Sequence, residues 1–352
     1  MIPYVEIRDK NTYKTLAIIE PQECWFELAY QEEGKFEIYC RASKGNLTAL
    51  QKGRFVTMPN KPYIWFITSV QYTFAAGGAR MISATGYEAK WLLKKRCILT
   101  PKELSGNITS AIYGLVSANI GATASTARKI VGFDVSTNDL LIDISGTQAP
   151  RENLLAFVTT LLKAHGCGHI ATLENGAIRY TVFKGEDKTQ SVRFSQSLDN
   201  LLSSEYLTDD ADIATHALVV STVDDVDYTQ EVYGETTGID RAEIIVSSNL
   251  STKYEDASGV EQETTPDSAL YKGWQIEEGK AKLSERITIE EINGEIDIVN
   301  SNYTFAEHFF IGDLVRTQDE YFNFVADTRI TKYTLKQDAN GYGEEAEYGG
   351  KQ

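Results

Sequence analysis

The sequence has few of the residues that build disulfide frameworks or histidine-based active sites. Its 352 residues include only 4 Cys, 4 His and 7 Pro. The cysteines, which lie far apart and form no CxxC pair, are Cys24, Cys40, Cys97 and Cys167. This spacing excludes a disulfide scaffold and predicts reduced, buried thiols.

Long apolar runs and basic clusters are also scarce. No segment approaches the roughly 18–20 apolar residues of a membrane helix. Residues 1–9 lack the basic lead and apolar centre of a secretory signal. Lys and Arg total 34 against 50 Asp and Glu, which gives a formal net charge of −16. This balance argues against nonspecific duplex binding and against docking on an anionic membrane, so we expect a soluble protein made in the cytoplasm.

Recognised catalytic and nucleotide-binding motifs are missing. The sequence has no P-loop, no GxGxxG that opens a helix and no GxSxG nucleophile elbow. A glycosidase needs only two carboxylates, so the carboxylate count cannot exclude one. His308 lies near Asp313 but is flanked by phenylalanines, which predicts a partly buried structural histidine. His216, the fourth histidine, adjoins no such motif either.

Three short clusters have both a functional and a structural interpretation. The acidic clusters at 209–212 and 224–227 offer hard-cation ligands, but they lack EF-hand spacing and are more typical of solvated loops. The basic run at 94–96 could touch phosphate, but it is more typical of a helix end or a solvated surface. We therefore assign neither kind of cluster to a binding site.

The most suggestive cluster is His-Gly-Cys-Gly-His at residues 165–169. Its three soft-metal ligands would share one face if the segment were extended. However, Gly166 is placed to end a helix and His165 suits the negative helix end. No distant Cys or His motif supplies a fourth ligand. We favour a helix–strand junction over a metal site, and we predict no catalytic, metal-binding or cofactor-binding residues and no cofactor.

The remaining patterns predict a mainly β protein with an α+β insertion. The 19 Tyr and 14 Phe favour pleated sheets. Predicted hairpins are 25–30 with 36–41, 63–74 with 79–87 around Gly77-Gly78, 170–173 with 178–183 around Asn175-Gly176, and 287–292 with 296–298 around Asn293-Gly294. Further strands are expected at 217–222, 240–246, 309–317 and 325–335, with a loop at 247–267. Predicted helices are 88–94, a helix from Leu104 to Asn119 capped by Ser105, one near Pro150 that Gly166 ends, and one from about 266 to 283.

These elements predict four segments. Residues 1–98 form a first β-barrel-like tube domain, and residues 99–190 form the α+β insertion. Residues 191–340 form a second β-barrel-like tube domain, and residues 341–352 form a mobile tail rich in Gly and Glu.

Several segments, in order along the chain, resemble the siphophage Gp37-like tail protein family. They are WFELAY at 25–30, GKFEIY at 34–39, NLTALQKGRF at 46–55, ATGYEAKWLLKKR at 84–96, FS and LDNLLSSEY within 194–206, and FFIGDLV at 309–315. The small-residue stretch at 121–125 departs from the family pattern.

The resemblance implies a structural, non-enzymatic baseplate hub protein at a virion tail tip, assembled in the host cytoplasm. Such proteins are similar to the hub of contractile coliphage baseplates. Three copies with two barrels each would form a ring between a hexameric tail tube and a threefold tip. The implied partners are two further copies, a distal tail protein or tail tube, and a tail fibre or receptor-binding protein. DNA would pass through the channel without specific binding, and acidic residues lining it would repel phosphates. The alternative functions are cell-wall degradation and carbohydrate binding.

Overall fold

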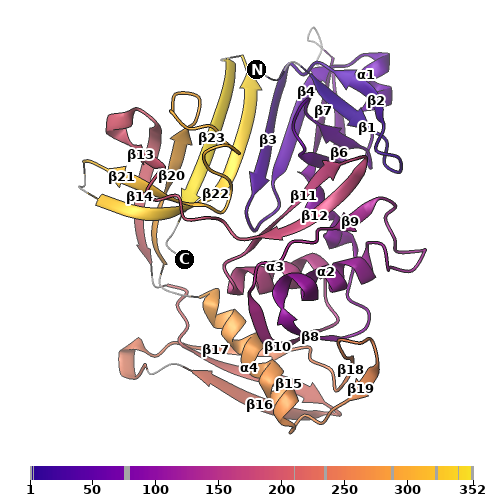
Figure 1. Ribbon diagram of the computed structural model, residues 1–352, viewed down its shortest axis with the longest axis vertical. Helices are drawn as coiled ribbons and strands as arrows, with labels where there is room; N and C mark the ends of the chain where they lie inside the picture. Colours follow the sequence, from indigo (N-terminus) through magenta and orange to yellow (C-terminus); the bar gives the residue numbers. More distant parts are fainter. Residues whose placement is uncertain are drawn as a thin grey trace.

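The computed structural model describes residues 2, 4–74, 80–209, 211–233, 236–286, 289–321, 324–339 and 341–349. The predicted turn at Gly77-Gly78 lies outside these residues. The chain is mainly β, as predicted, and its strands form four sheets (Figure 1).

The largest sheet joins strands from both ends of the chain. It has 13 strands, and its main path runs β14-β20-β23-β22-β3-β4-β7-β6-β5-β1-β2. The first part of the chain contributes β1 (Val5–Arg8), β2 (Thr15–Ile19), β3 (Glu23–Ala29), β4 (Lys35–Arg41), β5 (Phe55–Thr57), β6 (Ile64–Thr73) and β7 (Met81–Glu88). The last part contributes β13 (Arg193–Ser195), β14 (Leu201–Asp209), β20 (Ile289–Asp297), β21 (Leu314–Asp319), β22 (Phe324–Asp338) and β23 (Gly341–Gly349).

This continuous sheet corrects the prediction of two separate barrels. Strand β22 pairs antiparallel with β3 from Lys332↔Ala29 to Gln337↔Cys24, so the yellow and indigo strands lie side by side in Figure 1. None of the described sheets closes into a barrel. The predicted mobile tail is also wrong where it is described, because β23 pairs with both β20 and β22. Its Glu residues suit a strand with one polar face, a pattern that composition alone did not reveal.

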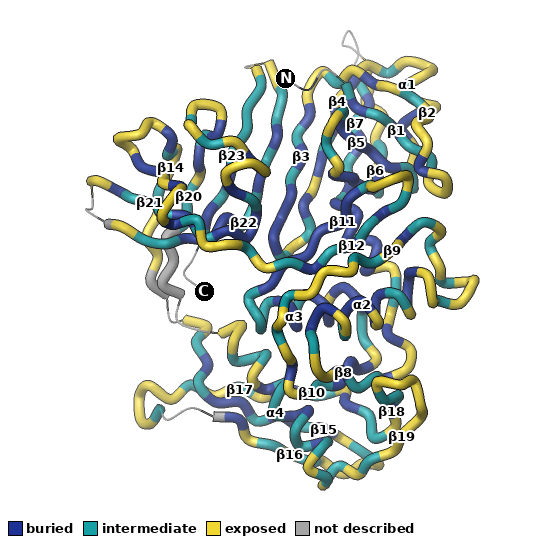
Figure 2. The backbone as a smooth tube through the Cα atoms, viewed as in Figure 1, coloured by how far each residue is buried: buried dark blue, intermediate teal, exposed yellow. Residues whose placement is uncertain are grey.

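One apolar core covers one face of the large sheet, and at β5 and β6 a second core covers the other face as well. Buried residues alternate with intermediate or exposed ones along β4 and along most of β3, and Figure 2 colours the backbone by this burial. Phe26, Ile38, Ile330 and Tyr333 belong to one buried cluster that draws on both ends of the chain. The 25–30 and 36–41 hairpin is therefore confirmed as β3–β4, and its buried face packs with strands more than 300 residues away in the sequence.

The α+β insertion packs in a second core, to which β5 and β6 of the large sheet also contribute. Its helices are η1 (Ala89–Lys95, a 3-10 helix), α2 (Ile108–Asn119) and α3 (Leu154–Ala164). Its strands are β8 (Lys102–Asn107), β9 (Phe133–Val135), β10 (Asp143–Ala149), β11 (Gly168–Glu174) and β12 (Ala177–Phe183). The predicted turn at Asn175-Gly176 is confirmed between β11 and β12, where both residues have positive φ. Helix α2 begins later than predicted, because residues 102–107 pair with β10 and Asn107 caps the helix instead of Ser105.

A further module lies between β14 and β20 in the sequence. Its sheet contains β15 (His216–Val223), β16 (Val226–Tyr233) and β17 (Glu243–Ser248), and α4 (Ala269–Ser284) packs against it. The stretch predicted as a loop at 247–267 contains two short strands, β18 (Lys253–Glu255) and β19 (Glu261–Glu263), which join β8 and β10. The remaining short helices are α1 (Lys44–Ala49), η2 (Gln196–Leu198) and η3 (Gly238–Asp240). No described helix is long and apolar enough to cross a membrane.

The predicted turn at Asn293-Gly294 is wrong. Both residues lie inside β20, which runs unbroken from Ile289 to Asp297 between β14 and β23. A Cβ on Gly294 would lie 2.1 Å from the carbonyl oxygen of Ser203 and 2.3 Å from the hydroxyl of Tyr348. Glycine is needed here for the close approach of neighbouring strands, which leaves the same Asn-Gly signature as a turn.

Candidate functional site

The segment 165–169 is a junction between α3 and β11. His165 is the C-cap of α3, and Gly166 follows it with φ +61°. The Gly166 amide donates to Lys163 O at 3.0 Å, and the Cys167 amide donates to Leu162 O at 2.9 Å. This is the Schellman arrangement, in which a left-handed glycine satisfies the last carbonyls of a helix. The prediction that Gly166 ends the helix is confirmed.

The potential metal ligands of this segment are engaged elsewhere. The His169 ring is buried, with Nε2 3.1 Å from Gln31 O and Nδ1 2.8 Å from the Tyr180 hydroxyl. A carbonyl only accepts, so Nε2 carries the proton and Nδ1 accepts from Tyr180. Burial lowers the pKa of His169 well below its usual value, and nearby Lys90 lowers it further. Across the described residues, no three His, Cys, Asp or Glu side chains gather as a metal site would require.

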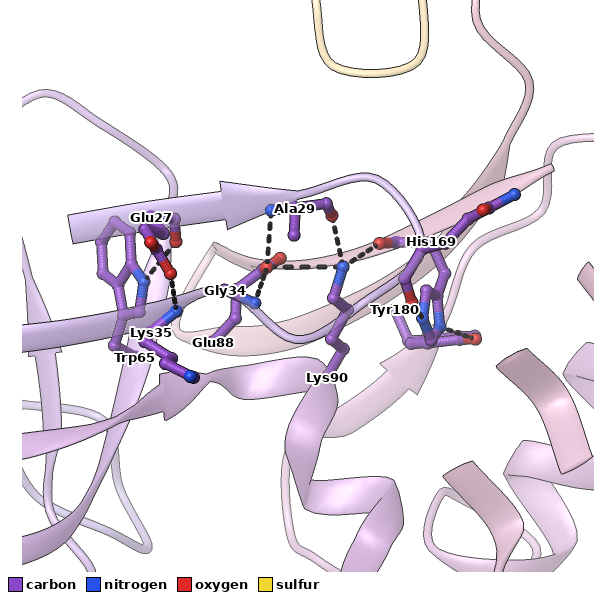
Figure 3. A network of polar contacts seen from close by, with 10 residues as sticks. Glu27, Ala29, Gly34, Lys35, Trp65, Glu88, Lys90, His169 and Tyr180 are labelled. Carbon is purple, nitrogen blue, oxygen red and sulfur yellow. Dashed lines mark hydrogen bonds and ion pairs between the residues drawn. The ribbon is translucent and has the colours of Figure 1, made fainter. Parts of the chain in front are cut away.

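A buried ion pair lies beside this histidine (Figure 3). Lys90 Nζ is 3.4 Å from Glu88 Oε2, and both side chains are fully buried. The ammonium also donates to Ala29 O at 2.5 Å and to His169 O at 2.9 Å, so its three protons all have acceptors. The same Glu88 oxygen accepts from the amides of Ala29 and Gly34, each at 3.3 Å.

The pair joins three parts of the fold. Ala29 ends β3, Gly34 precedes β4, the two charged residues flank the start of η1, and His169 lies in β11. Burial raises the pKa of Glu88 and lowers that of Lys90, while each charge opposes the shift of the other. Glu88 Oε1 is buried without a hydrogen-bond partner among the described atoms. The arrangement fixes the insertion on the first β region and leaves no access for a substrate.

The alternation of strand β7 in the sequence indicates that Glu88 is buried. Strand β7 alternates strictly, and Ile82, Ala84 and Gly86 all face the core. Continuing the same alternation places Glu88 on the buried face, where an acid requires a partner. Lys90 follows in the first turn of η1.

Tyr30 forms a second contact point at the same junction. Its amide donates to Thr331 O at 2.9 Å and its hydroxyl donates to Gly166 O at 2.8 Å. Its ring lies where side chains at two glycines would be: a Cβ on Gly168 would be 2.2 Å from the ring, and one on Gly312 would be 2.3 Å from it. Tyr30 therefore contacts the insertion and the last β region together, and the second glycine of the His-Gly-Cys-Gly-His segment makes room for it.

The other predicted clusters are not brought together. Asp224 and Asp225 form the exposed turn between β15 and β16, as expected of a solvated loop, whereas Asp210 lies outside the described residues. His308 is exposed and its Nδ1 accepts from the Thr304 amide, so the prediction of a partly buried histidine is wrong. The following backbone turn places Asp313, not His308, in the interior, where it accepts from the Glu186 and Phe310 amides.

Two other predictions about single residues are resolved. Cys24, Cys40 and Cys167 are free and buried as predicted, but Cys97 is exposed, because it lies just beyond η1. In the basic run, Lys95 lies over the Phe66 ring at 4.1 Å and Arg96 donates to Arg128 O. These contacts support the structural interpretation of residues 94–96.

The fold is similar to that of solved tail proteins, two of which are described as prophage proteins. A tail protein from Neisseria meningitidis MC58 shares 12% identity over 99% of this chain and 96% of that chain, with a TM-score of 0.56. The 43 kDa tail protein of prophage MuSo2 from Shewanella oneidensis shares 13% identity over 98% of each chain, with a TM-score of 0.57. Prophage tail protein gp18 from Listeria monocytogenes EGD-e shares 9% identity over 99% of this chain and 94% of that chain, with a TM-score of 0.51.

At these identities the likeness concerns the fold alone. No curated protein matches the sequence. The model of one family, described as siphovirus ReqiPepy6 Gp37-like protein, matches residues 4–349, which is nearly the whole chain. The chain therefore belongs to the siphovirus ReqiPepy6 Gp37-like protein family.

Proposed function

We propose that this protein is a structural baseplate hub protein of a phage or prophage tail tip, and that three copies form a ring around the path of the DNA. The observation that carries the proposal is the continuous sheet in which both ends of the chain are joined through β22 and β3. At its central strands, such as β3 and β4, this sheet is buried on one face and more exposed on the other, which is the form of a wall segment. Family membership and the tail-protein fold support the same assignment.

Both ends of the sheet are available for pairing. Among the described strands, β2 pairs only with β1, and β14 pairs only with β20. Exposed apolar side chains lie on both edge strands: Leu16 and Ile18 on β2, and Leu202 and Leu207 on β14. A free edge with apolar side chains is a template for another chain, and repeated contacts between two different edges close into a ring when the rotation allows.

The solvated face of the sheet suits a surface past which DNA slides. It presents cross-strand ion pairs, including Lys332–Glu347 at 2.8 Å and Lys336–Glu345. On the four central strands this face carries the acids Glu23, Glu27, Glu37, Asp338, Glu345 and Glu347 and the cations Lys35, Arg41, Lys332 and Lys336, so acids modestly outnumber cations. Paired charges leave few free cations to hold phosphates, so the earlier expectation of a strongly acidic lining is not part of the proposal.

The domain roles follow from this arrangement. In the proposal, residues 1–98 supply one wall segment of each copy, and the strands β13, β14 and β20–β23 of the last region supply the other. Residues 99–190 lie outside the ring with the α4 module. The ring adapts a hexameric tail tube to a threefold tip, with a distal tail protein or tail tube on one side and a tail fibre or receptor-binding protein on the other. In the proposal, the protein assembles in the host cytoplasm and is located at the tail tip of the virion.

The ring is tested on the purified full chain. Light scattering coupled to size-exclusion chromatography gives its mass, and negative-stain images give its shape. A threefold particle with a central hole supports the proposal. Incubation with purified peptidoglycan is the accompanying assay, and release of soluble fragments would contradict the structural, non-enzymatic role.

A further inference from the structure

A cavity lies between the insertion and the α4 module. Its volume is about 380 Å³, and residues of β10, α3 and α4 line it. Helix α4 contacts both α3 and β10, beside which it lies in Figure 1. Ile144, Phe157, Leu161 and Leu250 give part of the wall an apolar character. This volume lies within the usual range of roughly 300–1,000 Å³ for small-ligand pockets.

The acidic side chains that line the cavity outnumber its lysines. Lys280 Nζ is 2.9 Å from Glu277 Oε1, and Lys282 Nζ is 3.1 Å from the oxygen of Glu285. Both lysines are thus paired with acids of their own helix. Two further acids line the cavity, Glu152 before α3 and Glu278 in α4, and neither forms an ion pair with any residue that the structure describes.

Glu278 has an unused hydrogen-bonding atom. Its Oε2 is buried and lacks a partner among the described atoms. Burial raises the pKa of Glu278, against opposing effects of Ser248 and Lys282. Burial also raises the pKa of Glu152, and Glu278 raises it further, while Lys282 opposes the shift. Burial lowers the pKa of His165, so this ring is neutral near pH 7 and compensates neither carboxylate.

We propose that this cavity binds a primary alkylammonium group. An ammonium supplies three donors and one positive charge, which match the carboxylates of Glu152 and Glu278, two acids that form no ion pair among the described residues. An aliphatic stem of several carbons would pack on Phe157 and Leu161. The described acids and histidines form no three-ligand group, which favours an organic cation over a metal ion. A free amine and a lysine side chain of a partner protein share this chemistry.

Calorimetric titration of the full chain with n-hexylamine hydrochloride near neutral pH tests the site. Hexan-1-ol and hexanoate have the same stem without the positive charge. The amine should bind and the other two should bind at least roughly tenfold more weakly, a difference of about 1.4 kcal/mol. Glu278→Gln and Glu152→Gln should each weaken amine binding at least roughly tenfold. Glu261→Gln, an exposed change on β19 with the same loss of charge, should leave it unchanged.

Two further arms complete the test. Ala281→Leu retains all charges but places a larger side chain at the cavity wall, and it should abolish binding of the amine. Titration with Nα-acetyl-lysine methylamide identifies the source: binding assigns the site to a lysine of a partner, and no binding assigns it to a free amine. The inference is overturned if the wild-type chain does not bind n-hexylamine, if hexan-1-ol binds equally well, or if Glu278→Gln has no effect.

Discussion

Tyr30 and the two glycines around it hold the three parts of the molecule together at the scale of single residues. The ring fills space that a Cβ at position 168 or 312 would occupy, and the tyrosine backbone hydrogen bonds with β11 and β22. Gly312 also has φ +90°, where other residues are strained. Close approach of the backbone is therefore one requirement of this junction.

We predict that Gly168→Ala destabilises the protein by about 3 kcal/mol, at the upper end of overpacking effects. The new methyl group would be 2.2 Å from the Tyr30 ring and 2.6 Å from its carbonyl oxygen, and the backbone oxygen cannot rotate away. Urea unfolding followed by fluorescence measures the change. Gly273→Ala in α4 is the control, since nothing lies within 4 Å of its added methyl group, and it should stabilise by up to about 1 kcal/mol. Equal effects of the two substitutions would contradict the packing account.

The buried Glu88–Lys90 pair gives a second prediction at this scale. Lys90→Met leaves the Glu88 carboxylate buried without its cation, and it should cost about 3–5 kcal/mol. The double variant Glu88→Gln, Lys90→Met should lose less than the sum of the two single losses, because no buried charge remains. A double-mutant cycle by urea unfolding measures this coupling, and strict additivity would show that the two charges do not interact.

Secondary elements were predicted well where local chemistry determines them. The alternation of β3 and β4, the Asn175-Gly176 turn and the Gly166 helix end all follow from short-range rules. Asn293-Gly294 failed, because the need for glycine comes from β14 and β23 across the sheet. The cavity acids could not be predicted at all, since α3 and α4 are more than 100 residues apart in the sequence.

Glu278 in helix α4 makes a pH-dependent contribution to the free energy of unfolding. Burial raises the pKa of Glu278 in the folded chain, so the folded chain binds more protons than the unfolded chain above the ordinary carboxyl range. This contribution to stability is present below the pKa that Glu278 has in the unfolded chain. It is lost as the pH rises through the higher pKa that Glu278 has in the folded chain. Glu278→Gln should therefore gain stability relative to wild type on going from pH 4 to pH 7, by about 1.4 kcal/mol for each unit by which the folded pKa is raised. Urea unfolding across this range measures it, with Glu261→Gln as the control; a parallel offset at all pH values would contradict the assignment.

At the scale of the whole molecule, the sequence indicated a mainly β chain with an inserted α+β region and a tail-protein family. It did not reveal that the first and last regions form one open sheet, because the β22–β3 pairing spans about 300 residues and leaves no local pattern. The predicted strands at 217–222 and 240–246 and the predicted helix at 266–283 are confirmed as β15, β17 and α4, but their grouping into a separate module was not predicted.

The proposed ring predicts that edge substitutions affect assembly more than folding. Ile18 on β2 is 62% exposed and Leu202 on β14 is 51% exposed. Ile18→Lys and Leu202→Lys should each abolish the oligomer, since lysine on a free edge blocks strand addition, while the unfolding free energy changes by less than about 0.5 kcal/mol. Ile239→Lys, at a 99% exposed position in η3 away from both edges, is the control and should assemble normally. Sedimentation velocity compares the three variants, and normal assembly of both edge variants would rule out these edges as the interface.

The most direct test of the structural account is the mass of the purified chain by light scattering, combined with class averages of the same particles. The account predicts a mass of three times 39.2 kDa and a threefold ring with an open centre. A particle of 39.2 kDa at every concentration, without rings in the images, would contradict it.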